Sequence, residues 1–119
     1  MITLLRYRQP DAAVLGEPEW RPRLTAVLDA VAGSAGFSGG WIGRNPDDPR
    51  EWLVAVHWVD AGSMRRGLGG FEAKLALGPL EGFAAPGAGV FEILQSDEDG
   101  RRTVVRSERA ADADSSGPG

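Results

Sequence analysis

One segment of this chain, residues 52–59, is apolar on both of its alternating faces and contains the single histidine, His57. In an extended strand, successive side chains point to opposite sides of the sheet. One side of this segment would carry Trp52, Val54, Val56 and Trp58. The other side would carry Leu53, Ala55, His57 and Val59. Apolar residues on both sides are typical of a strand that is covered on both faces, so something must pack against each side of the sheet.

Composition limits what that covering can be. The chain has 119 residues, of which 42% are hydrophobic and 25% charged, which is typical of one globular domain with room for one sheet and two helices. Its formal net charge is -4. An acidic balance without a basic patch argues against nucleic acid and against an anionic membrane surface as partners. We therefore expect a small molecule or another protein chain as the partner.

The sequence also restricts cofactors and location. Without cysteine, and with one histidine, the chain cannot form disulfides or the usual zinc sites, although carboxylates leave calcium and magnesium open. We predict no cofactor and no metal. The first residues lack the features of a signal peptide, and no apolar run approaches the roughly 20 residues of a membrane span. The expectation is a soluble, cytoplasmic protein.

Periodicity predicts six elements. A first helix follows from an apolar stripe that Gly33 can end, formed by Trp20, Leu24, Val27, Leu28 and Val31. A second helix is predicted over 61–80, although three glycines at 67, 69 and 70 weaken it. Strands are predicted at 2–8, 37–44, 52–59 and 90–94, with a hairpin turn at 45–49.

The order βαββαβ predicts an α+β, ferredoxin-like fold, with a four-stranded antiparallel sheet and both helices on one face. Because residues 52–59 are apolar toward the other face as well, we expect two subunits to pack sheet against sheet, as a homodimeric α+β barrel. This domain would span residues 1–95. Residues 96–119 are polar and acidic, so a largely disordered tail is predicted there, with 103–105 as a candidate edge strand.

Several motifs resemble the antibiotic biosynthesis monooxygenase family of the dimeric α+β barrel superfamily. They are Gly-Phe-Ser-Gly-Gly at 36–40, Pro-Asp-Asp-Pro at 46–49, the strand that ends Val-His-Trp at 56–58 and leads into a helix, and Phe-Glu-Ile-Leu at 91–94. The resemblance covers about residues 1–95, and Trp58 before the second helix is its most recognisable point. It implies a dimer with pockets between the helices and the sheet of each subunit.

Members of that family include cofactor-independent oxygenases of polycyclic aromatic compounds, haem-degrading enzymes, and small isomerases or hydrolases. The haem-degrading branch uses a histidine in the second helix and an asparagine in the first strand. Here, residues 61–80 contain no histidine, Gly67 lies about where one is expected, and residues 2–8 contain no asparagine. The resemblance therefore favours the other branches.

Four residues are candidates for the site, and each has a structural alternative. Trp58 can form an apolar pocket wall and donate one hydrogen bond, or it can be a core residue that anchors the sheet. His57 is the natural general base near neutral pH, but its position in the strand points it toward a partner sheet, as an interface histidine. Arg65 can bind an anionic oxygen or lie on a solvated helix face. Tyr7 can hydrogen-bond a quinone-like carbonyl or serve in packing.

The function predicted is a cofactor-independent monooxygenase that combines an aromatic polyketide-like or quinol substrate with molecular oxygen. Such chemistry needs an electron-rich phenol or enol, a base, and a shielded pocket, while the substrate supplies the electrons. Two alternatives stay open. One is a non-catalytic binding or regulatory protein that holds an aromatic metabolite, and the other is a cofactor-free isomerase or cyclase.

Overall fold

The computed structural model describes residues 1–107, and its four main strands form one antiparallel sheet in the order β2-β3-β1-β4. The strands are β1 (Ile2–Arg8), β2 (Phe37–Arg44), β3 (Glu51–Trp58) and β4 (Gly89–Phe91). The first two agree with the sequence prediction. β3 begins one residue earlier and ends one residue earlier than predicted. The last strand is shorter than the predicted 90–94, because the chain leaves the sheet at Glu92.

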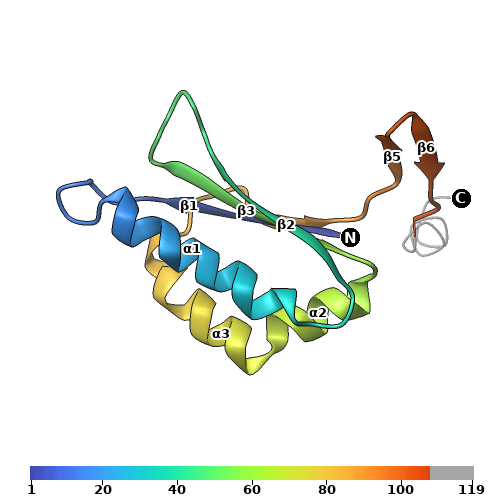
Figure 1. Ribbon diagram of the computed structural model, residues 1–119, viewed down its shortest axis with the longest axis horizontal. Helices are drawn as coiled ribbons and strands as arrows, with labels where there is room; N and C mark the ends of the chain where they lie inside the picture. Colours follow the sequence, from blue (N-terminus) through green and yellow to red (C-terminus); the bar gives the residue numbers. More distant parts are fainter. Residues whose placement is uncertain (108–119) are drawn as a thin grey trace, which may run out of the picture.

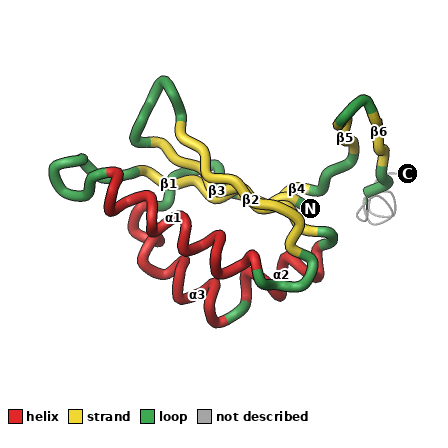
Figure 2. Tube along the Cα trace, viewed as in Figure 1, coloured by secondary structure: helices red, strands yellow, loops and turns green. Residues whose placement is uncertain are grey.

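The helices lie together on one face of this sheet, as Figures 1 and 2 show. They are α1 (Glu17–Ala32), α2 (Ala61–Gly69), α3 (Phe71–Leu77) and the 3₁₀ helix η1 (Gly78–Phe83). Strand order and helix placement confirm the predicted α+β, ferredoxin-like fold. None of the helices in residues 1–107 is long and apolar enough to cross a lipid bilayer.

The prediction of one continuous helix over 61–80 is wrong, because the structure has three shorter helices there. Gly70 has an extended backbone, with φ -69° and ψ 159°, so that it ends α2 and begins α3. Residues 78–83 then form a 3₁₀ turn instead of continuing the α-helix. Glycine lowers helix stability by about 1 kcal/mol per residue relative to alanine, and three glycines within four residues leave little helical preference to resist a break.

The sheet packs its core against α1. On β3, the four side chains at 52, 54, 56 and 58 are all at most 2% exposed, and α1 contributes fully buried residues along the predicted stripe. These stripe residues are Trp20, Leu24, Val27 and Val31. The alternation predicted for β3 is confirmed, and so is the core position of Trp20.

The chain beyond the sheet contains a second, small sheet. Strands β5 (Gln95–Glu98) and β6 (Arg101–Val104) form an antiparallel hairpin that stands off the end of the main sheet in Figure 1. Its turn has positive φ angles at Asp99 and Gly100, 52° and 72°, as a two-residue hairpin turn requires. The tail predicted to be largely disordered thus begins with an ordered hairpin, and two residues of the candidate edge strand at 103–105 lie in β6. Residues 108–119 lie outside the described residues, and the prediction for them stays a prediction.

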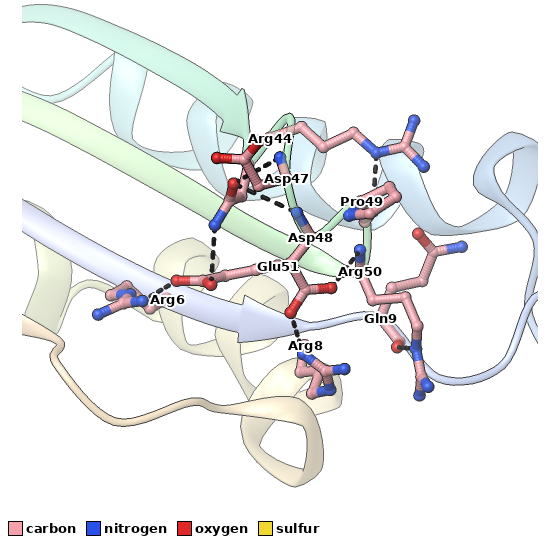
Figure 3. A network of polar contacts seen from close by, with 10 residues as sticks. Arg6, Arg8, Gln9, Arg44, Asp47, Asp48, Pro49, Arg50 and Glu51 are labelled. Atoms are coloured by element: carbon pink, nitrogen blue, oxygen red, sulfur yellow. Dashed lines mark hydrogen bonds and ion pairs between the residues drawn. The ribbon is translucent and has the colours of Figure 1, made fainter.

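Charged side chains fix the loop between β2 and β3 to β1 at the opposite end of the sheet (Figure 3). Arg8 donates to Asp48 at 2.8 Å, and Arg6 forms an ion pair with Glu51. Arg44 donates from Nε to the Pro49 carbonyl at 2.7 Å. The hydrogen bond from Arg8 is the main cause that lowers the pKa of Asp48. This end of the sheet is closed by its own polar contacts.

Candidate functional site

A cavity of about 390 Å³ lies where β3 runs into α2, between the open face of the sheet and the segment that carries the β5–β6 hairpin. This volume is in the range of small-molecule sites. The apolar part of its lining consists mainly of Trp41, Trp58, Val59, Ile93, Leu94 and Val105. His57 and the charged residues Glu92, Glu98 and Arg106 add polar groups. The cavity therefore combines an aromatic wall with ionisable side chains.

A second, wider groove adjoins this cavity at the start of α2. Its lining includes Arg65, Arg66 and Phe91. Four residues line both the cavity and the groove, which makes them one continuous depression; they are Met1, Asp60, Ala61 and Glu92. We call this depression the α2-end hollow. Three of the four predicted site residues, His57, Trp58 and Arg65, border it.

Trp58 is completely buried and its polar atom is already bonded. Its indole Nε1 donates to the Thr3 hydroxyl oxygen at 3.2 Å. Its ring meets Phe37 edge to face, with 6.2 Å between centroids. A Cβ at Gly67 would overlap the indole, so this glycine lets α2 approach the ring. Trp58 is thus a core anchor of the helix-covered face; the residue borders the cavity at the end of β3, but its ring is completely buried, and its predicted role as a pocket wall stays a prediction.

His57 lies on the open face of the sheet, opposite to Trp58. In the strand pairing it faces Ile2 of β1 and Gly39 of β2, and its side chain is half-buried. Parity alone predicts this placement. Since His57 lines the cavity, the structure makes it available to a bound molecule as well as to a partner sheet.

The start of α2 is organised by Asp60. Its carboxylate accepts a hydrogen bond from the Ser63 backbone N–H at 2.7 Å and caps the helix. This bond is the main cause that lowers the pKa of Asp60. Arg66 donates to the Ser63 hydroxyl at 3.4 Å, and both Arg65 and Arg66 line the groove. The first turns of α2 therefore bring two guanidinium groups to the hollow, which is the kind of group that binds an anionic oxygen.

Tyr7 does not belong to this hollow. It pairs with Trp52 on the helix-covered face, four residues along β1 from Thr3, the hydrogen-bond partner of Trp58. The Tyr7 side chain is 6% exposed, and burial, followed by the charge of Glu81, raises its pKa. A phenol with a raised pKa keeps its proton at neutral pH and can donate a hydrogen bond.

Residues that the sequence analysis did not single out complete the hollow. Glu92 lies at its centre and accepts a hydrogen bond from the Ser107 hydroxyl at 2.6 Å. Glu98 and Val105 arrive with the hairpin segment. The dipeptide Asp99-Gly100, a strong hairpin signal, was the available clue to this segment. Within residues 1–107, no group of three or more histidine, aspartate or glutamate side chains is arranged to hold a metal ion.

Comparisons with known proteins show which solved structures share this fold. No protein-family model matches the chain, and no curated protein matches it. Solved structures do. SnoaB, a cofactor-independent oxygenase from Streptomyces nogalater, superposes in the form of a mutant with a TM-score of 0.70 at 17% identity, over 82% of this chain and 96% of SnoaB.

Two further structures carry the name of the same family. A candidate antibiotic biosynthesis monooxygenase from Nitrosomonas europaea superposes with a TM-score of 0.60 at 8% identity, over 74% of this chain and 90% of that protein. Another, from Chloroflexus aurantiacus, gives a TM-score of 0.54 at 16% identity, over 89% and 92% of the two chains. The resemblance seen in the sequence is thus confirmed at the level of architecture: this chain has the fold of the antibiotic biosynthesis monooxygenases.

Proposed function

We propose that this protein is a cofactor-independent monooxygenase that acts on an aromatic polyketide-like or quinol substrate in the α2-end hollow. The observation that carries the proposal is the meeting of three features around one space. They are the aromatic wall of Trp41, the imidazole of His57, and the guanidinium of Arg65. A fold shared with a cofactor-independent oxygenase supports the same conclusion.

Each group has a role that fits its position. His57 accepts a proton from the substrate, because imidazole is the side chain best suited to general-base catalysis near neutral pH. Arg65 stabilises the oxyanion that the proton loss creates. The aromatic wall holds the ring of the substrate and keeps water from the intermediate. Tyr7 has no part in this site, since it lies four residues further along β1 than the contact with Trp58.

The reaction balances without an external reductant. A substrate methylene beside an aromatic ring loses a proton, and the resulting carbanion passes one electron to oxygen. The radical pair combines to form a carbon–oxygen bond, which gives a hydroperoxide after protonation. Loss of water then leaves a carbonyl, so that R₂CH₂ and O₂ become R₂CO and H₂O. The substrate carbon is oxidised and oxygen is reduced.

We further propose that the protein works as a homodimer in the cytoplasm. The open face of the sheet carries large apolar side chains at high exposure, with Trp41 at 56% and Phe91 at 53%. Large exposed apolar side chains on one face of a sheet are typical of an interface. A second copy packed on this face would shield Trp41 and close the cavity beside His57.

Oxygen uptake tests the catalytic proposal. Chelator-treated protein is offered a panel of hydroxyanthrones and quinols, and uptake is compared with the non-enzymatic rate. We expect uptake above that rate, reduced at least tenfold by Arg65→Gln and by His57→Ala. Arg23→Gln, an exposed arginine on α1, is the matched control and should leave the rate unchanged.

Two other outcomes favour the alternatives. Saturable quenching of tryptophan fluorescence without any turnover would support a non-catalytic binding or regulatory protein. Turnover that continues under nitrogen would support a cofactor-free isomerase or cyclase. Either result would overturn the oxygenase proposal.

A further inference from the structure

The two arginines that line the α2-end hollow, Arg65 and Arg66, form no ion pair within residues 1–107. At the opposite end of the sheet, by contrast, Arg6 and Arg8 each form an ion pair with an acidic side chain (Figure 3). The hydrogen bond of Arg66 goes to a neutral group, the Ser63 hydroxyl. Two positive charges therefore border a space in which a bound anion can meet them.

The acidic side chains of the hollow already accept hydrogen bonds from other groups. Asp60 accepts one from the Ser63 backbone N–H at 2.7 Å, and Glu92 accepts one from the Ser107 hydroxyl at 2.6 Å. The charge of Arg66 is only a lesser cause of the lowered pKa of Asp60. The two carboxylates repel a phosphate group, which carries nearly two negative charges, more strongly than a carboxylate, which carries one. The hollow therefore favours a carboxylate among anions.

Helical spacing gives the two arginines different places in the hollow. Residues four apart lie on the same face of a helix. Arg65 follows Ala61, which lines both the cavity and the groove, whereas Arg66 follows Gly62, which lines the groove and not the cavity. A Cβ at Gly62 would lie 3.1 Å from Nη1 of Arg66, so the guanidinium folds back over this glycine. Arg65 thus lies toward the cavity, and Arg66 lies further out in the groove.

The cavity offers an aromatic surface next to His57. A Cβ at Gly39 would lie 3.1 Å from the Trp41 ring, so the indole lies over this glycine. Gly39 pairs with His57 in the sheet, and both Trp41 and His57 line the cavity. The Trp41 side chain is exposed, and a flat indole of this kind can stack against the ring of a bound molecule. A ring stacked there would lie beside the imidazole.

We propose that the substrate of the α2-end hollow is an aromatic carboxylate. Its ring stacks on Trp41 in the cavity, and its carboxylate, carried away from the reacting carbon, extends into the groove and is bound by Arg66. Arg66 is then a specificity-determining residue, while Arg65 stabilises the oxyanion formed beside His57. The assignment rests on the proposed function, since it places the substrate in the same hollow.

Two probes with the same ring system test the assignment, namely 2-naphthoate and its neutral amide, 2-naphthamide. The full-length protein is titrated with each by isothermal titration calorimetry under nitrogen, so that binding is measured without oxidation. We expect the carboxylate to bind about fivefold to tenfold more tightly than the amide, because a guanidinium binds a charged acceptor more strongly than a neutral one. Added salt should reduce this preference, since both charges are accessible to solvent ions.

Substitutions at three arginines locate the preference. Arg66→Gln should bind the two probes equally, with the affinity for the amide unchanged within about twofold, which shows that the ring site is intact. Arg66→Lys should keep part of the preference, because it keeps the charge but loses the planar fork. Arg65→Gln should keep the preference that Arg66→Gln loses. Arg23→Gln, on α1 outside the hollow, is the matched control for net charge and should behave as the wild type does.

Three results would overturn the assignment. Equal affinities of the wild type for the two probes would mean that the hollow does not select a carboxylate. A preference that survives in Arg66→Gln would mean that another group binds the carboxylate. Failure of both probes to bind at millimolar concentration would mean that the hollow holds no aromatic carboxylate.

Oxygen uptake separates this assignment from the oxygenase proposal. A carboxylate preference that depends on Arg66, found without oxygen uptake on any substrate of the panel, would support the binding site and overturn the oxygenase. Enzyme-dependent uptake without a carboxylate preference would support the oxygenase and overturn the role of Arg66.

Discussion

The two faces of the sheet both carry apolar side chains, but these side chains differ in how far they are exposed. On the helix-covered face, the β3 side chains at 52, 54, 56 and 58 are at most 2% exposed. On the open face, Trp41 and Phe91 stay more than half exposed, and the cavity beside His57 lies there. An apolar pattern on both sides of a strand therefore correctly predicts burial on one face only in this chain. It does not report whether the same chain supplies the cover.

The largest expected difference between the faces is in stability. Trp58→Ala removes a fully buried indole, and we expect the free energy of unfolding to fall by about 3–5 kcal/mol. Trp41→Ala, on the open face, should cost less than about 1 kcal/mol under dilute, monomeric conditions. Urea denaturation followed by circular dichroism measures both. Similar losses for the two variants would contradict the comparison.

For self-association, a change on the open face should have the larger effect. Trp41→Glu places a charge on the open face, and we expect the dimer to weaken by about 2 kcal/mol or more, which is roughly thirtyfold in dissociation constant. Sedimentation equilibrium should then report the 12.6 kDa monomer at concentrations where the wild type is dimeric. Val14→Glu, at a site 79% exposed and outside the sheet, is the control. A wild type that is monomeric at every concentration would refute the proposed dimer.

Two glycines of α2 test how tightly the helix-covered face is packed. A Cβ at Gly67 would overlap the Trp58 ring, whereas a Cβ at Gly69 meets nothing within 4 Å. We expect Gly67→Ala to destabilise the protein by about 1–2 kcal/mol, because overpacking outweighs the gain in helix propensity. Gly69→Ala should be neutral or slightly stabilising. Thermal unfolding of the two variants gives the sign of each change in stability. Equal melting temperatures would show that the Trp58 ring moves aside without destabilising the protein.

The smallest expected effect is on acid stability. Hydrogen bonding to Ser63 lowers the pKa of Asp60 below its ordinary value near 3.8. A carboxylate whose pKa is lower in the folded state stabilises the fold above its unfolded pKa, and this contribution is lost as the pH falls below about 4. Asp60→Asn should therefore flatten part of the decline in stability below that pH. Because asparagine can also cap a helix, an unchanged acid profile in the variant would show that ionisation of Asp60 contributes nothing to stability.

Much of the fold follows from periodicity. The alternation in 52–59 and the helical stripe that includes Trp20 and Val31 identify β3 and α1, because burial repeats with the period of the element. The break at Gly70 does not follow. Three nearby glycines each allow a turn, and tertiary packing decides which one takes it.

The site is less predictable for a physical reason. Parity places His57 and Trp58 on opposite faces, but the separation of Tyr7 from Trp58 depends on the register between β1 and β3. Glu92 reaches the hollow only because the chain leaves β4 there. The Trp20 N–H finds no acceptor among residues 1–107, and the sequence carries no signal of this, since it depends on where acceptors lie in three dimensions.

Isotope labelling tests the proposed oxygenase reaction most directly. Chelator-treated protein is mixed with a hydroxyanthrone under oxygen-18 gas, and product and water are analysed by mass spectrometry. We predict one heavy oxygen atom in the new carbonyl of the product, the other in water, and a yield that falls in Arg65→Gln. Product formed at an enzyme-dependent rate without heavy oxygen, or formed equally well under nitrogen, would contradict the proposal.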